Sequence, residues 1–209
     1  MVIDMPLEVV DLIVSLSSWK AWGRTWSKVC KRYSKVDWLF GSLASGTYSV
    51  VPDMVPTINQ AISMGRRLVF VRPGVYTESV RMTHDVIVCG LGAQGAARVR
   101  APGWEPALVW GGFRAGCIQA PGLHLSAASG GIHAEVHSLL LTQRNQLQQI
   151  AVYITYGNPL LANCTIEGSI HVAGRGARPT LHECTVRGSR SCGIRFVDHA
   201  SGCALSSCS

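Results

Sequence analysis

The stretch PLLANCTIEG at residues 159–168 is followed 20 residues later by PTLHECTVRG at residues 179–188. A shorter copy, CALSSC, follows at residues 203–208. A period of about 20 to 24 residues is typical of solenoids, whose coils bury their apolar faces only by stacking on one another. The repeats therefore predict parallel strands that stack about 4.8 Å apart, coil over coil.

Aligning the copies brings together two sets of equivalent side chains: Leu161, Leu181 and Leu205, and Cys164, Cys184 and Cys208. We expect the leucines to form an inward apolar ladder. Short alternating strands containing Ile154, Val172 and Phe196 precede the copies. A buried thiol behaves as a small apolar side chain, so the cysteine ladder is expected to fill the core and not to bind metal.

A second pattern lies upstream of the repeats. VRPGVYTE at residues 71–78 places Gly74, Tyr76 and Glu78 at alternate positions, after TI at 57–58 and AI at 61–62 and before VCGLG at 88–92. This run resembles the opening of pectin-lyase-like β-helix proteins, particularly pectin methylesterases. The resemblance implies a right-handed parallel β-helix whose first coil is covered by a helix at residues 56–64. Strands are expected at residues 68–71 and 86–89.

The first 45 residues have apolar side chains at helical spacing. MPLE at residues 5–8 opens this segment and VCKRY at residues 29–33 closes it. The segment resembles the F-box, and solenoid domains of this kind occur in F-box only proteins. The resemblance implies docking on the Skp-type adaptor of a cullin ubiquitin ligase through Met5, Pro6, Ile13, Leu16, Val29, Cys30 and Tyr33.

The chain is thus expected to be mainly β, with a small all-α F-box-like module at residues 1–45 and a parallel β-helix of roughly seven coils at residues 46–209. Residues 41–52, rich in Gly, Ser and Thr, are expected to form the boundary. The sequence stops inside the third copy, at residue 209, so we expect a truncated or open last coil. We expect a homo-oligomer to form there, with contacts near residues 194–208.

Residues suited to acid–base catalysis are scarce. After residue 90 the acids are Glu105, Glu135, Glu167, Glu183 and Asp198. Glu167 follows its ladder cysteine by three positions and Glu183 precedes its own by one, so the two are not expected to stack. Glu78 is expected to be structural, and no carboxylate or cysteine is expected at metal-site spacing beside His133 and His137. The sequence therefore predicts no catalytic residue, no metal and no cofactor.

The composition and the N-terminal sequence indicate the cellular location that we expect for the protein. Lys and Arg outnumber Asp and Glu by 19 to 12, and every basic residue after Lys35 is Arg. No apolar run reaches the length of a membrane span, and the N-terminus lacks the basic region of a secretory signal. The eight cysteines are therefore expected to be reduced, in the cytoplasm or nucleus (of the host cell, if the chain is viral).

The two resemblances together favour a substrate-recognition adaptor of a Skp/cullin/F-box ubiquitin ligase. The F-box-like module would dock the Skp-type adaptor and the β-helix would bind an unidentified target protein. The alternative is a pectin-lyase-like carbohydrate-binding or carbohydrate-active protein, which the missing carboxylate cluster disfavours. A polyanion binder using the arginine excess is a third reading, but few aromatic residues follow Trp110, so nucleic acid is not expected.

Overall fold

The computed structural model describes residues 48–111, 134–143, 150–174, 176–189, 192–197, 200 and 202–209. The chain divides after Thr47, and all described residues belong to the unit Tyr48–Ser209. The helical module predicted at residues 1–45 lies outside the described residues. Within the described ranges, no helix is long and apolar enough to cross a membrane.

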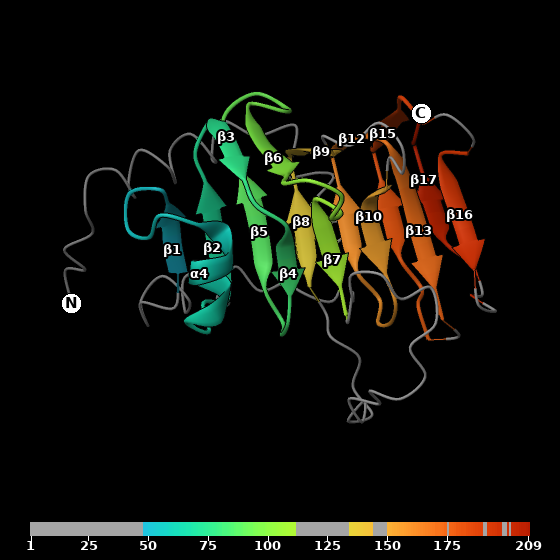
Figure 1. Cartoon of the computed structure of the whole chain (residues 1–209), viewed down its shortest axis with the longest axis horizontal. Helices are drawn as coiled ribbons and strands as arrows, with labels where there is room; N and C mark the ends of the chain where they lie inside the picture. Colours follow the sequence, from blue (N-terminus) through green and yellow to red (C-terminus); the bar gives the residue numbers. More distant parts are fainter. Residues whose placement is uncertain are drawn as a thin grey trace. The chain divides into compact units, whose positions relative to one another are not determined.

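The described residues form three sheets, and every strand pairing in them is parallel (Figure 1). Sheet A contains, in spatial order, β1 (Tyr48–Val51), β2 (Leu68–Val71), β5 (Ile87–Gly90), β8 (Glu135–His137), β11 (Leu160–Ala162), β14 (Thr180–His182) and β17 (Ala204–Ser206). Sheet B contains β3 (Gly74–Thr77), β6 (Ala97–Ala101), β9 (Leu139–Gln143), β12 (Thr165–Glu167) and β15 (Thr185–Arg187). Sheet C contains β4 (Val80–Met82), β7 (Leu108–Trp110), β10 (Ile150–Ile154), β13 (Ser169–Ala173) and β16 (Ile194–Val197).

From β2 onward the chain visits sheets A, B and C in turn, and each strand pairs with its equivalents before and after it, except at the ends of the sheets. The prediction of a mainly β chain with stacked parallel strands is confirmed, and the arrangement is compatible with a parallel β-helix. Leu161 stands opposite Leu181, and Leu181 opposite Leu205. The leucine ladder therefore has the register that the repeats predicted.

The core lies between the three sheets and follows the alternation of each strand. Leu161 and Leu181 are fully buried in it, as is Trp110 from β7. Cys164 and Cys184 belong to the same buried cluster, as expected of core residues. Burying one large apolar side chain stabilises a fold by about 1.5–3 kcal/mol, so the repetition of such ladders is what holds the coils together.

The turn from sheet A to sheet B repeats one backbone conformation. Its residues have positive φ angles between 51° and 55°, and they are Ser138, Asn163, Glu183 and Ser207. The left-handed region is uncommon outside Gly, and Asn tolerates it best. The side-chain amide of Asn163 also donates to the Ser138 hydroxyl at 3.2 Å, which links two successive turns. The repeat thus extends to the turns as well as to the strands.

A short helix, α4 (Ile58–Ser63), lies against the first coil, with contacts to β1, β2 and β4. The Thr57 side chain caps it by accepting from the Gln60 N–H, and Gly65 follows its end with a φ of 72°. The helix predicted at residues 56–64 is confirmed. The chain divides within the stretch expected as a boundary, residues 41–52, and residues 48–51 of that stretch form β1, which pairs with β2.

The last strands of the stack expose apolar side chains. Among the described residues, β15, β16 and β17 pair on one side alone. Phe196 on β16 is 44% exposed and Leu205 on β17 is 58% exposed, although their equivalents one coil earlier are buried. The homo-oligomer expected near residues 194–208 stays a prediction.

Candidate functional site

The residues expected to contact a Skp-type adaptor, from Met5 to Tyr33, lie outside the described residues. A candidate site is therefore sought among the polar groups of the stacked parallel strands. These groups fall into three places: the opening signature with its neighbouring turn, the outer carboxylates of the repeats, and a buried pair on β8.

The opening signature consists of Gly74, Tyr76 and Glu78, and the side chains of Tyr76 and Glu78 stabilise the first coil. The Tyr76 hydroxyl lies 2.9 Å from the carbonyl oxygen of Arg72. The two carboxylate oxygens of Glu78 accept the backbone N–H groups of Ile58 at 3.0 Å and Asn59 at 2.9 Å, at the start of α4. These N–H groups have no partner inside a helix, so a carboxylate there stabilises the helix end. Glu78 thus ties α4 to β3, as expected of a structural residue.

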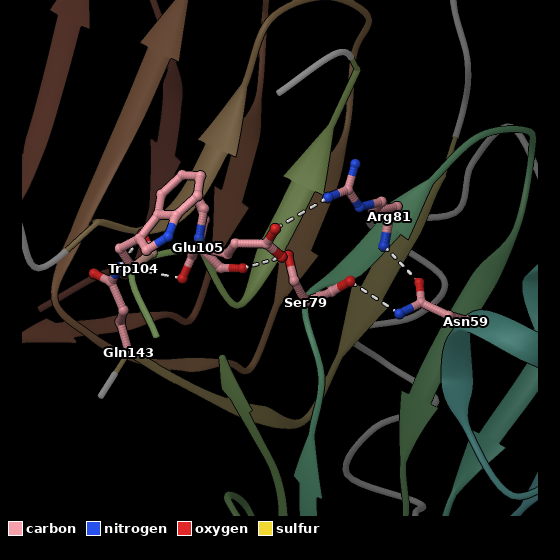
Figure 2. Close-up of polar contacts among 7 residues, drawn as sticks. Asn59, Ser79, Arg81, Trp104, Glu105 and Gln143 are labelled. Carbon is pink, nitrogen blue, oxygen red and sulfur yellow. Dashed lines mark hydrogen bonds and ion pairs between the residues drawn. The ribbon is translucent and has the colours of Figure 1, made fainter. Parts of the chain in front are cut away.

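Asn59 continues this connection from α4 to sheet C (Figure 2). Its amide donates to the Ser79 carbonyl oxygen and accepts the Arg81 backbone N–H, each at 2.9 Å. The Ser79 hydroxyl donates to the Pro106 carbonyl oxygen at 2.7 Å. The Arg81 guanidinium in turn forms an ion pair with Glu105 at 3.4 Å. These contacts hold the turn before β7 against β4.

The same turn is held from the other side by β9. The Gln143 amide donates to the carbonyl oxygens of Trp104 at 2.7 Å and Glu105 at 3.1 Å. We name Asn59, Ser79, Arg81, Trp104, Glu105 and Gln143 the turn cluster (Figure 2). Trp104 is 39% exposed, so the cluster presents one aromatic surface beside an ion pair. Most of its polar groups are nevertheless engaged in fixing the turn.

The remaining outer carboxylates are also engaged. Glu167 stands in register with Arg187 and pairs with it at 2.9 Å, whereas Glu183 pairs with His182 at 3.5 Å. The two glutamates therefore do not stack, as the spacing of the repeats predicted. Asp53 pairs with Arg72 on the first coil. Within the described part of the chain, no carboxylate is left without a partner.

A buried acid–base pair lies on β8. Glu135 and His137 are both buried, and Glu135 Oε2 lies 2.9 Å from His137 Nε2. Cys89 on β5 stands directly beside His137 in the strand register. Sequence reasoning missed this pair, because it tested His137 only for metal-ligand spacing. Residues two positions apart on a strand share one face, and β5 contributes its cysteine from far along the chain.

A thiol, an imidazole and a carboxylate in this order resemble the parts of a nucleophilic site. Burial, however, raises the pKa of the Cys89 thiol to about 12. At neutral pH the thiol is therefore protonated, and only a thiolate attacks or binds a metal. In the ranges that the structure describes, no group of three or more His, Cys, Asp or Glu residues could hold a metal ion. The arrangement is thus best suited to packing.

We expect Cys89 to resist alkylation in the folded protein. Its raised pKa and its burial together keep the thiolate scarce and the sulfur covered. Treatment of the full chain with iodoacetamide at pH 8, followed by mass spectrometry of its peptides, should label the partly exposed Cys192 and Cys208 well before Cys89. Labelling of Cys89 at the rate of Cys208 would contradict the prediction. Cys89 should be labelled readily once the protein is unfolded in urea.

Within the cysteine ladder, Cys164 is inert for the same reason. Cys164 is fully buried, and its thiol donates to the carbonyl oxygens of Val136 at 3.5 Å and Ala162 at 3.3 Å. Burial raises the pKa of the Cys164 thiol well above its usual range. The described cysteines are free thiols. Cys164 and Cys184 therefore fill the core, as expected from the repeats, whereas Cys208 is only partly buried.

Comparison with known proteins gives the chain no relative: no protein-family model, no curated protein and no solved structure matches it significantly.

Proposed function

We propose that this protein is a substrate-recognition adaptor of a Skp/cullin/F-box ubiquitin ligase. In this proposal, the segment from Met5 to Tyr33 docks the Skp-type adaptor and the solenoid holds the target protein. The chain itself then catalyses nothing, because bringing a target lysine near the loaded ligase raises its effective concentration. The observation that carries the proposal is the F-box-like pattern joined to a stack of parallel strands.

The engagement of the carboxylates supports a binding role for the solenoid. Glu78 binds a helix end, Glu105 and Glu167 bind arginines, and Glu135 binds a histidine. A glycoside-cleaving site needs two carboxylic groups facing one bond. The described carboxylates serve instead to fix the fold, which leaves its outer faces available as rigid surfaces for a partner.

We further infer that the solenoid is a right-handed, pectin-lyase-like β-helix. Connections between parallel strands of one sheet are right-handed in the great majority of proteins, because strand twist favours that hand. The opening signature and its helix α4 at the first coil also support this assignment. The free thiols fit the proposed location in the cytoplasm or nucleus.

Carbohydrate binding is the competing function, and Trp104 gives it some support. A partly exposed indole beside a carboxylate and an amide is a common kind of sugar-binding surface. The Gln143 amide, however, donates to two backbone carbonyl oxygens, and Glu105 pairs with Arg81. Since few polar groups of the turn cluster remain for sugar hydroxyls, the adaptor function is favoured.

The proposal predicts direct binding of the full chain to a purified Skp-type adaptor. Isothermal titration calorimetry should show binding by the unaltered protein and a loss of at least about tenfold for Leu16→Asp and for Val29→Asp, because each places a charge in an apolar interface. Pro6→Ala should weaken binding less. Met64→Asp is the matched control, since Met64 is 52% exposed on the solenoid, and it should bind normally.

Binding that is absent from the unaltered protein would refute the adaptor function. Equal losses in Leu16→Asp and Met64→Asp would also refute it, because the effect would then not come from the F-box-like segment. Circular dichroism of each variant should show the same β-sheet signal as the unaltered protein. This comparison separates loss of the interface from loss of the fold.

A further inference from the structure

The outward side of β6 carries two arginines. Burial alternates along this strand, so that Ala97, Val99 and Ala101 lie in the core while Arg98 and Arg100 point outward and are partly exposed. Residues two positions apart on one face of a strand lie roughly 6.7 Å apart. The two guanidinium groups therefore share a small area of the outer face of sheet B.

The neighbouring strands β3 and β9 surround this area (Figure 1). Arg100 stands in register between Thr77 and Thr142, which are exposed and partly exposed. Arg98 stands between the exposed Val75 and the buried Leu140. Neighbouring strands lie about 4.8 Å apart, so both threonine hydroxyls are close to the Arg100 stem. We name Thr77, Arg98, Arg100 and Thr142 the arginine face.

The two charges are not compensated within the described residues. Arg72, Arg81 and Arg187 each form an ion pair with a carboxylate. Within the described residues, the side chains of Arg98 and Arg100 have no such partner and no hydrogen bond.

The acids nearest in the chain are already engaged. Glu78 follows Thr77 but binds the start of α4, and Glu105 binds Arg81. Like charges this close on one sheet face repel each other. A bound anion would relieve that repulsion.

We propose that the arginine face binds an extended acidic segment of a target protein, in which two Asp or Glu residues stand two positions apart. The inference rests on the proposed adaptor function and names the chemistry of its target. Alternate side chains of an extended segment point to one side and repeat at the same spacing of about 6.7 Å. Each carboxylate can therefore accept a bidentate pair of hydrogen bonds from one guanidinium. The hydroxyls of Thr77 and Thr142 are available as further donors.

The outer face of sheet B favours a protein over a nucleic acid as the partner. Its outward positions from β3 to β15 are occupied by Val, Leu, Thr, Arg and Glu, with no aromatic side chain among these described positions. Single-stranded nucleic acids are held largely by bases stacked on aromatic rings. Paired arginines without such rings suit carboxylates better than bases.

Fluorescence anisotropy with the full chain tests the proposal. The probe is a short fluorescein-labelled Gly/Ser peptide containing Glu-Ser-Glu, and the reference peptide contains Glu-Glu-Ser, which has the same charge in another spacing. Glu-Ser-Glu should bind several-fold more tightly. Arg98→Gln with Arg100→Gln should weaken its binding by at least about tenfold, the range expected when charge-assisted hydrogen bonds are lost. Arg98→Lys with Arg100→Lys should bind the peptide with intermediate affinity, because lysine keeps the positive charge but cannot form the bidentate hydrogen bonds of a guanidinium group.

A matched control removes the same charge elsewhere. Arg67 and Arg178 are exposed on the solenoid, and Arg67→Gln with Arg178→Gln should leave peptide binding unchanged. Equal losses in both double variants, or equal affinity for the two peptide spacings, would overturn the proposal. Tighter binding of a peptide with a single phosphoserine, or of a poly-uridine oligonucleotide that also depends on Arg98 and Arg100, would overturn it as well.

Measuring adaptor binding with the same protein variants distinguishes a failure of the arginine face from a failure of the adaptor function. The Arg98→Gln and Arg100→Gln double variant should still bind the Skp-type adaptor in calorimetry. If the unaltered protein binds the peptide but not the adaptor, the adaptor function fails while the arginine face stands. If it binds the adaptor but not the peptide, the arginine face fails alone.

Discussion

Replacing Leu161 by Ala is expected to lower the free energy of unfolding by about 2–5 kcal/mol. Leu161 is fully buried, and it stands in register between Val136 and Leu181, which are also fully buried. A cavity at this place removes packing on both neighbouring coils, so the loss should fall in the upper part of that range. Urea denaturation followed by circular dichroism measures it.

Leu160 provides the matched control, because it is the adjacent leucine on the same strand and is only partly buried on the outer side of sheet A. Leu160→Ala should cost less than half as much as Leu161→Ala. Similar losses in the two variants would mean that the inward ladder does not carry the stability of the stack. A loss larger for Leu160→Ala would reverse the assignment of the inner and outer sides of β11.

Gly90→Ala is expected to destabilise the protein by about 2–3 kcal/mol, in the upper part of the usual cost of forcing atoms into a packed site. Gly90 is the last residue of β5, and it packs against Ser138 and Leu139 of the next coil. A Cβ atom there would lie 2.5 Å from the Ser138 carbonyl oxygen and 2.8 Å from a Leu139 methyl group. Because this oxygen belongs to the backbone, the clash with the added Cβ atom can be relieved only if the two coils move apart. The urea midpoint should fall accordingly.

Gly176→Ala is the control for this change. A Cβ at Gly176 would meet no atom within 4 Å. Its stability should therefore change by less than about 0.5 kcal/mol, as is usual for surface substitutions. If Gly90→Ala proves as stable as Gly176→Ala, the close approach of β5 to the turn at Ser138 is not a feature of the protein in solution.

The repeats predicted the register of the C-terminal coils because their equivalent residues recur in the sequence itself. Leu161, Leu181 and Leu205 could be aligned without any structure, and the strands place them in one column. β1 could not be found in this way. Of its two inward positions, Val51 is apolar but Ser49, buried opposite Val69, is polar, so the sequence does not show the alternation of apolar and polar residues expected of a strand. The strand is identified only by its pairing with β2.

The polar contacts were predicted less completely than the fold. The structural role of Glu78 followed from the opening signature, but its helix-capping partners did not, since they come from a separate element. The pair of Glu135 and His137 could have been found from their spacing in a strand-like stretch. Cys89 could not, because it joins them from 48 positions away through strand pairing. Contacts between coils need a register, and the repeats supply one only for the C-terminal third.

The spacing between paired strands has a consequence for how the chain folds. In sheet A most paired residues are 19 to 25 positions apart, but Ile87 and Glu135 are 48 apart. The matching steps in the other sheets are also long, at 42 positions between Ala97 and Leu139 and 44 between Leu108 and Val152. Each doubling of a closed loop adds about 0.6 kcal/mol of entropic cost, and distant contacts slow folding. We therefore expect the chain to fold as two blocks of low contact order, β1–β7 and β8–β17, and the docking of one block on the other to be the slow step in completing the stack.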